Sequence, residues 1–240
     1  MTRPPDGAGT VVVFAKSPRP GRVKTRMCPP LSADQAAALY AAMLDDVLVA
    51  TGAFAAALGL EPVLALDPAA EAPLWEGRVP GGYRVIGQHG RSLAERMGEV
   101  AAREAGPGRG PLLLRGSDSP ALPRETLEQA LGALETSDVA IAPDPDGGYS
   151  LIGLAGAWPG LFSHPMSTAH VLDETLAQAR RLGARTRLVA GSFDLDRIED
   201  LHALHAIREA PEAALCPRTL AYLDGAGLWP SRAGGRAEEA

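Results

Sequence analysis

Cysteine is scarce in this chain, and the common cysteine-based sites are absent. The 240 residues include only Cys28 and Cys216, and no CxxC pair. Zinc ribbons and disulfide frameworks need several closely spaced cysteines, so the sequence excludes both classes. No HExxH segment occurs either. We expect two reduced thiols in a cytoplasmic protein.

The chain also lacks an excess of positive charge and a long hydrophobic run. Its 23 Lys and Arg residues are outnumbered by 29 Asp and Glu residues, which gives a formal net charge of −6. Proteins that bind the nucleic-acid backbone usually present a broad basic surface, so we exclude nucleic acid as the main partner. No segment has the pattern of a signal peptide or the apolar length of a membrane span, and we expect neither.

What remains is the composition of an ordinary globular protein, 46% hydrophobic and 22% charged. Short apolar segments alternate with segments of helical spacing, beginning with a capping box at Ser32 and Gln35. Alternation of this kind predicts an α/β fold, with a mainly parallel sheet flanked by helices on both faces. We expect one domain over residues 10–226, with flexible tails at 1–9 and 231–240. The expected strands are 10–14, 62–66, 83–86, 111–115, 138–142, 149–154 and 186–189, and the later helices 92–104, 124–134, 168–182 and 197–207.

A cationic loop follows the first predicted strand. Residues 14–26 read FAKSPRPGRVKTR and carry five basic residues, two prolines and a glycine. Connections between a strand and a helix are usually short and polar. A long cationic one therefore indicates an anion site, most often for nucleotide phosphates, although a solvated basic loop is the alternative. The spacing fits neither the Walker A loop nor GxGxxG. Lys24 and Arg26 precede the next helix and are placed to reach phosphate oxygens, whereas Arg19 and Arg22 do the same or face water.

Carboxylates follow two further strands, where open α/β sheets bind ligands. Asp118, after the strand 111–115, either holds Mg²⁺ against phosphates or forms an Asx turn that caps the next helix, and its spacing leaves both open. Asp194 and Asp196 follow the last strand two positions apart, so extended backbone points them to one side. We expect one of them to be a metal ligand and the other to cap the helix near Arg197.

Two segments are candidates for binding a second substrate. The tandem glycines of Asp146-Gly147-Gly148 allow close approach to a ligand, and Asp146 could bond a ligand hydroxyl, although a plain turn also explains them. Backbone N–H groups at the helix start within 162–170 could hold an acceptor anion. His164 and His170 in this stretch are more typical of surface or capping residues. The predicted acceptor-binding set is Asp146, Gly147, Gly148, Ser167 and Thr168.

Four motifs occur in order: AKSPRPGRVKTRM, GSDSPAL, DGGYSLIGL and DLDRIEDL. Together they resemble the bacterial DUF2064 family over residues 11–204. The resemblance implies a nucleotide-dependent transferase with a GT-A fold, like that of nucleotide-diphospho-sugar transferases. A looser similarity, through Lys24-Thr25-Arg26, Ser167, His170 and residues 194–196, is to the 2-phospholactate and phosphoenolpyruvate guanylyltransferases. Met166-Ser167-Thr168 stands where the DUF2064 pattern usually has Trp-Ser-Thr, so the acceptor pocket is expected to differ.

The resemblance implies roles for particular residues. Lys24 and Arg26 would hold the nucleotide phosphates, and Asp118 would hold Mg²⁺ or Mn²⁺ with Asp194 or Asp196 as partner. Asp46 would support the basic loop by an ion pair or be a solvated helix charge. The predicted catalytic set is Lys24, Arg26 and Asp118, and the metal set is Asp118, Asp194 and Asp196. The predicted nucleotide-binding set is Ala15, Lys16, Gly21, Arg22, Lys24 and Ser117.

The leading hypothesis is nucleotidyl transfer, in which a phosphate-bearing small molecule attacks the α-phosphorus of an NTP and releases pyrophosphate. The first alternative is glycosyl transfer from an NDP-sugar, with Asp146 as the candidate carboxylate base. The second is a non-catalytic nucleotide-binding domain. The sequence does not determine which nucleotide base or which acceptor is used, or whether the chain forms a homo-oligomer.

Overall fold

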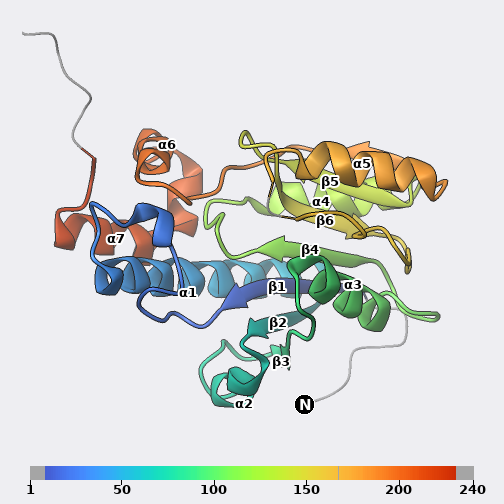
Figure 1. Ribbon diagram of the computed structural model, residues 1–240, viewed down its shortest axis with the longest axis horizontal. Coiled ribbons are helices and arrows are strands. Elements are labelled where there is room, and N and C mark those ends of the chain that lie inside the picture. The colour runs from blue at the N-terminus through green and yellow to red at the C-terminus, as the bar shows by residue number, and fades with distance from the viewer. Residues whose placement is uncertain (1–8, 167, 231–240) are drawn as a thin grey trace, which may run out of the picture.

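A seven-stranded sheet in the order β3-β2-β1-β4-β6-β5-β7 organises the chain (Figure 1). The structure is a computed structural model that describes residues 9–166 and 168–230. The predicted tails at 1–8 and 231–240 lie outside the described residues, whereas Gly9 is buried and accepts a hydrogen bond from Glu61. The strands are β1 (Thr10–Lys16), β2 (Glu61–Asp67), β3 (Arg84–Gly87), β4 (Leu112–Gly116), β5 (Val139–Pro143), β6 (Tyr149–Leu154) and β7 (Thr186–Leu188).

The pairing of the strands is parallel except around β6, which runs antiparallel to β4 and β5. Helices α3 (Leu93–Glu104) and α5 (Val171–Arg181) pack on one face of the sheet, and α1 (Ala33–Leu58) and α4 (Arg124–Leu134) pack on the other (Figure 1). Val12 of β1 joins the core on the α3 side, and Val11 and Val13 join the cores on the α1 side. The predicted α/β class, a mainly parallel sheet with helices on both faces, is therefore confirmed.

The helices expected at 92–104 and 124–134 agree with the structure, whereas one short helix earlier in the chain and the helices near its end differ. The expected helix 197–207 is divided into a 3₁₀ turn (Ile198–Asp200) and α6 (Leu201–Ala206), and the helix expected from 168 begins at Val171. Helices α2 (Ala72–Trp75) and α7 (Pro217–Ala226) were not expected. The α-helices are α1 (Ala33–Leu58), α2 (Ala72–Trp75), α3 (Leu93–Glu104), α4 (Arg124–Leu134), α5 (Val171–Arg181), α6 (Leu201–Ala206) and α7 (Pro217–Ala226). The 3₁₀ helices are η1 (Thr25–Met27), η2 (Ala69–Glu71), η3 (Ile198–Asp200) and η4 (Pro211–Leu215).

Helix α1 is the central helix behind β1. The predicted capping box is present, since Ser32 Oγ accepts from Gln35 N and Gln35 Oε1 accepts from Ser32 N. Among the described helices, α1 alone is long and apolar enough to cross a membrane. Here it packs against β1, β2 and α7, as a core helix does.

Asp46 joins α1 to α7. Its carboxylate is buried and accepts from the backbone N–H groups of Arg218 and Thr219, at 3.1 and 2.8 Å, and from the Thr219 hydroxyl at 2.8 Å. Both expectations for Asp46 are wrong, because it neither pairs with the basic loop nor faces solvent. It satisfies the free donors at the start of α7 instead.

Candidate functional site

The basic loop ends in an unusual backbone conformation. Among the described residues other than glycine, Lys24 alone has a positive φ, of 47°. This left-handed conformation is unfavourable for a residue with a Cβ. Such residues are often found at active sites, where the surrounding structure holds the backbone in place. Lys24 directly precedes the 3₁₀ turn η1, and its side chain is only 3% exposed.

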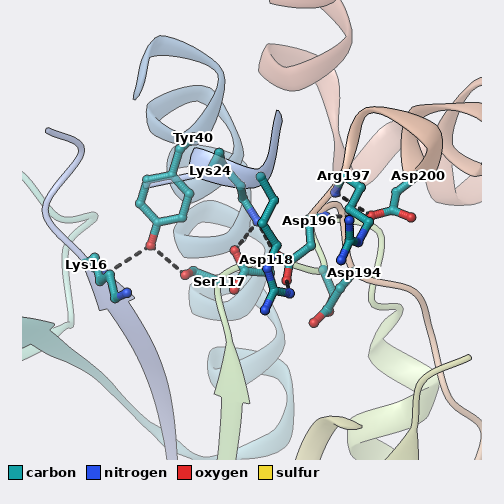
Figure 2. Close-up of polar contacts among 11 residues, drawn as sticks. Lys16, Lys24, Tyr40, Ser117, Asp118, Asp194, Asp196, Arg197 and Asp200 are labelled. Atoms are coloured by element: carbon teal, nitrogen blue, oxygen red, sulfur yellow. Dashed lines mark hydrogen bonds and ion pairs between the residues drawn. The ribbon is translucent and has the colours of Figure 1, made fainter. Parts of the chain in front are cut away.

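Lys24 lies between two carboxylates (Figure 2). Its Nζ donates to the Asp118 carboxylate and, at 3.0 Å, to Asp196 Oδ1. Burial by itself lowers the pKa of Lys24, but the charges of Asp118 and Asp196 outweigh burial and raise it above its usual value. Lys24 is therefore protonated and positively charged at neutral pH. Asp118 and Asp196, whose side chains are 38% and 37% exposed, remain open to a ligand.

Tyr40 of α1 connects the ends of β1 and β4. Its hydroxyl accepts from Lys16 N at 3.0 Å and lies 2.7 Å from Ser117 Oγ (Figure 2). Lys24 Nζ is 5.8 Å from the centroid of the Tyr40 ring. Burial raises the pKa of Tyr40 to about 12, so its phenol stays neutral. Two residues of the predicted nucleotide-binding set, Lys16 and Ser117, are thus linked through a side chain that the sequence indicated only as part of an apolar helix face.

The segment 193–196 brings two further carboxylates to the turn after β4. Leu195 N donates to the Asp118 carbonyl at 3.0 Å, which places the two segments side by side. Asp196 also lies 3.5 Å from Arg26 Nη1. Burial alone raises the pKa of Asp196, but Lys24, together with Arg26 and Arg197, outweighs burial and holds it below its usual range. The Ser119 hydroxyl donates to Asp194.

The capping roles fall to other residues than expected. Asp200 Oδ2 accepts from the N–H groups of Asp196 and Arg197 at 2.8 and 2.6 Å (Figure 2). The expectation that Asp194 or Asp196 caps this turn is therefore wrong. The Asx-cap alternative for Asp118 is also wrong, because α4 begins after Pro123 and has no side-chain cap.

Arg115 is a fully buried cation next to the Asp118 turn, and no sequence pattern indicated a role for it. Its guanidinium donates to the carbonyls of Gly116 and Ser119, at 3.3 and 2.7 Å, and to Thr51 Oγ1 at 2.9 Å. Burial lowers the pKa of Arg115 to about 10, so it stays charged at neutral pH. The two carbonyls flank Ser117 and Asp118, so Arg115 fixes the turn that presents them.

The remaining residues of the predicted nucleotide-binding set lie in β1 and in the loop that follows it. Gly21 has a φ of 72°, and both Gly21 and Arg22 are exposed. The Ala15 carbonyl accepts from Gln88 Nε2 at 3.0 Å, so Ala15 is part of the sheet edge. Arg19 pairs with Glu71. The side chain of Arg26 is 58% exposed and lies close to Asp196.

The donor set suits a divalent metal. Within the described residues, no group of three or more His, Cys, Asp or Glu side chains is arranged to hold a metal ion. Lys24 Nζ takes the position between Asp118 and Asp196. Carboxylate oxygens are nevertheless the hard ligands that Mg²⁺ and Mn²⁺ prefer. Asp118, Asp194 and Asp196 therefore fit such an ion in chemistry, provided that Lys24 moves away.

The predicted acceptor residues form two adjoining turns. Asp146 Oδ1 accepts from Gly148 N at 2.9 Å, as in a plain Asx turn. Gly147 has a φ of 89°, and a Cβ there would lie 2.1 Å from the Ala169 carbonyl. Gly147 thus permits close packing against the backbone of the same chain at Ala169, and not the expected close approach to a ligand. Thr168 Oγ1 accepts from His170 N at 3.2 Å, just before α5, and Ser167 lies outside the described residues.

A cavity of about 510 Å³ lies between α3 and the segment 157–164. It shares no residue with the cluster around Lys24. Its lining includes Ser92, Glu95, Trp158, Phe162 and His164.

The chain belongs to the DUF2064 family, described as uncharacterized proteins conserved in bacteria, whose profile matches residues 49–168. The expected membership is confirmed. No curated protein matches the sequence significantly.

Solved structures share the fold. A candidate nucleotide-diphospho-sugar transferase from Desulfovibrio desulfuricans G20 is 28% identical over 91% of this chain and 98% of its own, with a TM-score of 0.77. The 4-diphosphocytidyl-2C-methyl-D-erythritol synthase of Anaerococcus prevotii is 11% identical over 85% and 96%, with a TM-score of 0.56. A cytidylyltransferase from Leptospira borgpetersenii is 10% identical over 95% and 99%, also with 0.56. The predicted nucleotide-diphospho-sugar transferase-like fold is therefore confirmed.

Proposed function

We propose that this protein is a Mg²⁺- or Mn²⁺-dependent nucleotidyltransferase that couples an NTP to a phosphate-bearing small molecule and releases pyrophosphate. The observation that carries the proposal is the buried Lys24 cation between Asp118 and Asp196. Ligands of open α/β sheets bind at the carboxyl ends of the strands, and Asp118 lies two residues beyond β4. The similarity in fold to a cytidylyltransferase supports the transferase class.

The cations of the loop supply charge stabilisation. Lys24 Nζ donates to two carboxylates that are themselves partly exposed, so incoming phosphate oxygens can replace those carboxylates as acceptors. Arg26 is exposed, and its contact with Asp196 is long, at 3.5 Å, which leaves it free to turn toward the same phosphates. Both cations would stabilise the charge that develops on the pyrophosphate leaving group.

Asp118 and Asp196, with Asp194, would hold the divalent metal. When bound, the metal would neutralise phosphate charge and orient the reacting groups. Asp118 and Asp196 already bind one cation, the Lys24 ammonium, and Arg115 fixes the turn that presents Asp118. Asp118, Asp194 and Asp196 would therefore act mainly by positioning and electrostatics.

The acceptor needs no general base, because a phosphate monoester is already anionic at neutral pH. We assign acceptor binding to Asp146, Gly147, Gly148, Ser167 and Thr168, since the Gly147 turn adjoins the segment before α5. The proposal places the reaction in the cytoplasm, where NTPs are abundant.

A second candidate is glycosyl transfer from an NDP-sugar, which the name of the Desulfovibrio protein favours. An inverting enzyme would need a carboxylate base, and Asp146 is exposed and available for that role. Five cations in one loop suit a triphosphate better than a diphosphate ester. A non-catalytic nucleotide-binding domain would bind the same ligands without forming a product.

Thermal stability in the presence of each NTP and common NDP-sugars, with and without Mg²⁺, separates these functions. A ligand at about a hundred times its Kd stabilises the fold by roughly 2.7 kcal/mol. We expect the largest shift with an NTP and Mg²⁺, and product formation once a phosphate-bearing acceptor is added. A preference for an NDP-sugar over every NTP would favour glycosyl transfer, and binding without any product would favour the non-catalytic domain.

A further inference from the structure

The cavity between α3 and the segment 157–164 is large enough to hold a small molecule. Its volume of about 510 Å³ falls within the range typical of ligand sites. On the α3 side it is lined from Ser92 to Ala102, a span of about 15 Å at the rise of an α-helix. Trp158 and Phe162 form part of the opposite wall. The cavity is therefore long, and both aromatic rings lie on one side of it.

The space is open because the residues of α3 that face it are small. Ala94, Gly98, Ala101 and Ala102 line the cavity. A Cβ placed on Gly98 would meet no other atom within 4 Å. The space in front of Gly98 thus belongs to the cavity, and a larger side chain at this position would fill it.

Both walls of the cavity begin at the edge of the sheet that carries the candidate site. Gln88, which precedes α3, donates to the Ala15 carbonyl at 3.0 Å, at the end of β1. On the opposite wall, His164 Nε2 lies 3.1 Å from Thr175 Oγ1, which lies 3.5 Å from the hydroxyl of Tyr149. Tyr149 begins β6 and pairs with the end of β5. The cavity therefore runs along α3 from the edge where the basic loop and the predicted acceptor turn lie.

Most polar side chains of the lining already have partners within the protein. Ser92 Oγ accepts from Glu95 N at 3.2 Å, and Glu95 Oε2 accepts from Arg91 N at 2.7 Å. The two ring nitrogens of His164 each lie 3.1 Å from an oxygen of the protein. A sugar or a nucleobase would lose its hydrogen bonds to water here and find few replacements, which is unfavourable. The lining therefore favours an apolar occupant.

The charges of the lining disfavour a phosphate inside the cavity. None of the described residues that line it is a lysine or an arginine, and Glu95 contributes a negative charge. The ends of the chain do not suit the cavity either, because residues 1–8 and 231–240 contain no large apolar side chain besides Met1. An uncharged, apolar part of a small molecule is the occupant that the lining matches.

We propose that the cavity binds the apolar part of the acceptor, and that the acceptor is a phosphate monoester with an extended hydrocarbon group. The inference deepens the proposed function and rests on it for the phosphate end of the acceptor, which the turn at Asp146 and the segment before α5 would hold. Each methylene removed from water strengthens binding about fourfold. The cavity thus selects acceptors by the length of their hydrocarbon group and not by hydrogen bonds.

Isothermal titration calorimetry of butyl, hexyl and octyl phosphate with the full chain and Mg²⁺ tests the site. Wild type should bind octyl phosphate at least about tenfold more tightly than butyl phosphate. Gly98→Leu, which fills the cavity, should lose this dependence on chain length. The matched control is Gly132→Leu in α4, where a Cβ also meets no atom within 4 Å, and it should keep the wild-type dependence. Equal affinities for the three esters in wild type, or the wild-type dependence in Gly98→Leu, would overturn the inference.

A second variant and a competitor make the test more specific. Gly98→Met fills the same space with a side chain that adapts to irregular gaps, and both substitutions replace a glycine inside a helix with a better helix former. The Tm of each variant without ligand checks that it is folded. Both variants should bind octyl phosphate no more tightly than butyl phosphate. Displacement of octyl phosphate from wild type by cytidine or another nucleoside would assign the cavity to the nucleotide base and contradict the inference.

Failure of this inference can be distinguished from failure of the proposed function. Binding that depends on chain length and is abolished by Gly98→Leu, in a protein that turns over no NTP, would support the apolar site and refute the nucleotidyltransferase. Turnover that depends on Asp118, with an acceptor affinity that does not change with chain length, would do the reverse.

Discussion

Lys24 and Asp118 lie 94 positions apart in the chain and form an ion pair at one edge of the sheet. The pair exists because β1 and β4 are parallel neighbours, so the segments that leave their carboxyl ends meet. Asp196 reaches the same ammonium from 172 positions away. The site therefore depends on the completed sheet and not on a local motif.

Replacing Lys24 tests its assigned role in transfer. Lys24→Met should lower kcat/KM for the NTP by about a hundredfold to a thousandfold, the usual cost of losing one donor that stabilises transition-state charge. Steady-state kinetics with far-UV circular dichroism would show the loss in a folded protein. Arg187→Met removes an exposed cation of β7 and should retain wild-type kinetics. Equal activity in Lys24→Met and Arg187→Met would remove Lys24 from the mechanism.

Asp46 is expected to matter for stability. Asp46→Ala leaves the donors at the start of α7 without their buried acceptor, which should lower the free energy of unfolding by about 3 kcal/mol. Urea unfolding measures this change. Asp45→Ala, at the exposed neighbouring position, should stay within about 0.5 kcal/mol of wild type. Similar values for the two variants would contradict the link between α1 and α7.

The pH dependence of stability should reveal the pairing of Arg84 with Glu104. Burial by itself raises the pKa of Glu104, but its hydrogen bond and charge interaction with Arg84 lower it below its usual 4.5. A depressed folded-state pKa contributes stability above the unfolded-state value, and this contribution is lost as the pH falls through the folded-state value.

Arg84→Met should therefore reduce the free energy of unfolding more at pH 7 than at about pH 3.5. Urea unfolding at both pH values gives the difference. Arg187→Met provides the control, because the described contacts of Arg187 include no ion pair, and its effect should not change with pH. A deficit for Arg84→Met that is constant or grows toward acid would contradict the expected sign.

Much of the sheet and the location of the candidate site followed from local sequence patterns. Apolar segments followed by charged residues predicted the strand ends to within about two residues, and Ser32 with Gln35 predicted the start of α1. The family motifs placed Lys24, Asp118 and Asp196 in one site, and the structure brings these three together. Whether they bind nucleotide and metal stays a prediction.

The errors concern contacts that no local pattern encodes. Asp46 caps a helix that starts 171 positions later, beginning at Pro217, although Pro217 itself is a readable helix-start signal. Asp200 takes the capping role expected of Asp194 or Asp196 because its side chain reaches back four residues. Tyr40 fits the apolar spacing of α1, and only its long-range contact with Ser117 shows its second role.

Pyrophosphate release tests the central claim most directly. Wild type and Asp118→Asn would be compared with the NTP that binds best, Mg²⁺ and a panel of phosphate-bearing acceptors. The account predicts that wild type releases pyrophosphate together with a nucleotide-linked product, and that Asp118→Asn remains folded but is slower by at least about a hundredfold. Wild-type turnover in Asp118→Asn would contradict the assignment of the active site.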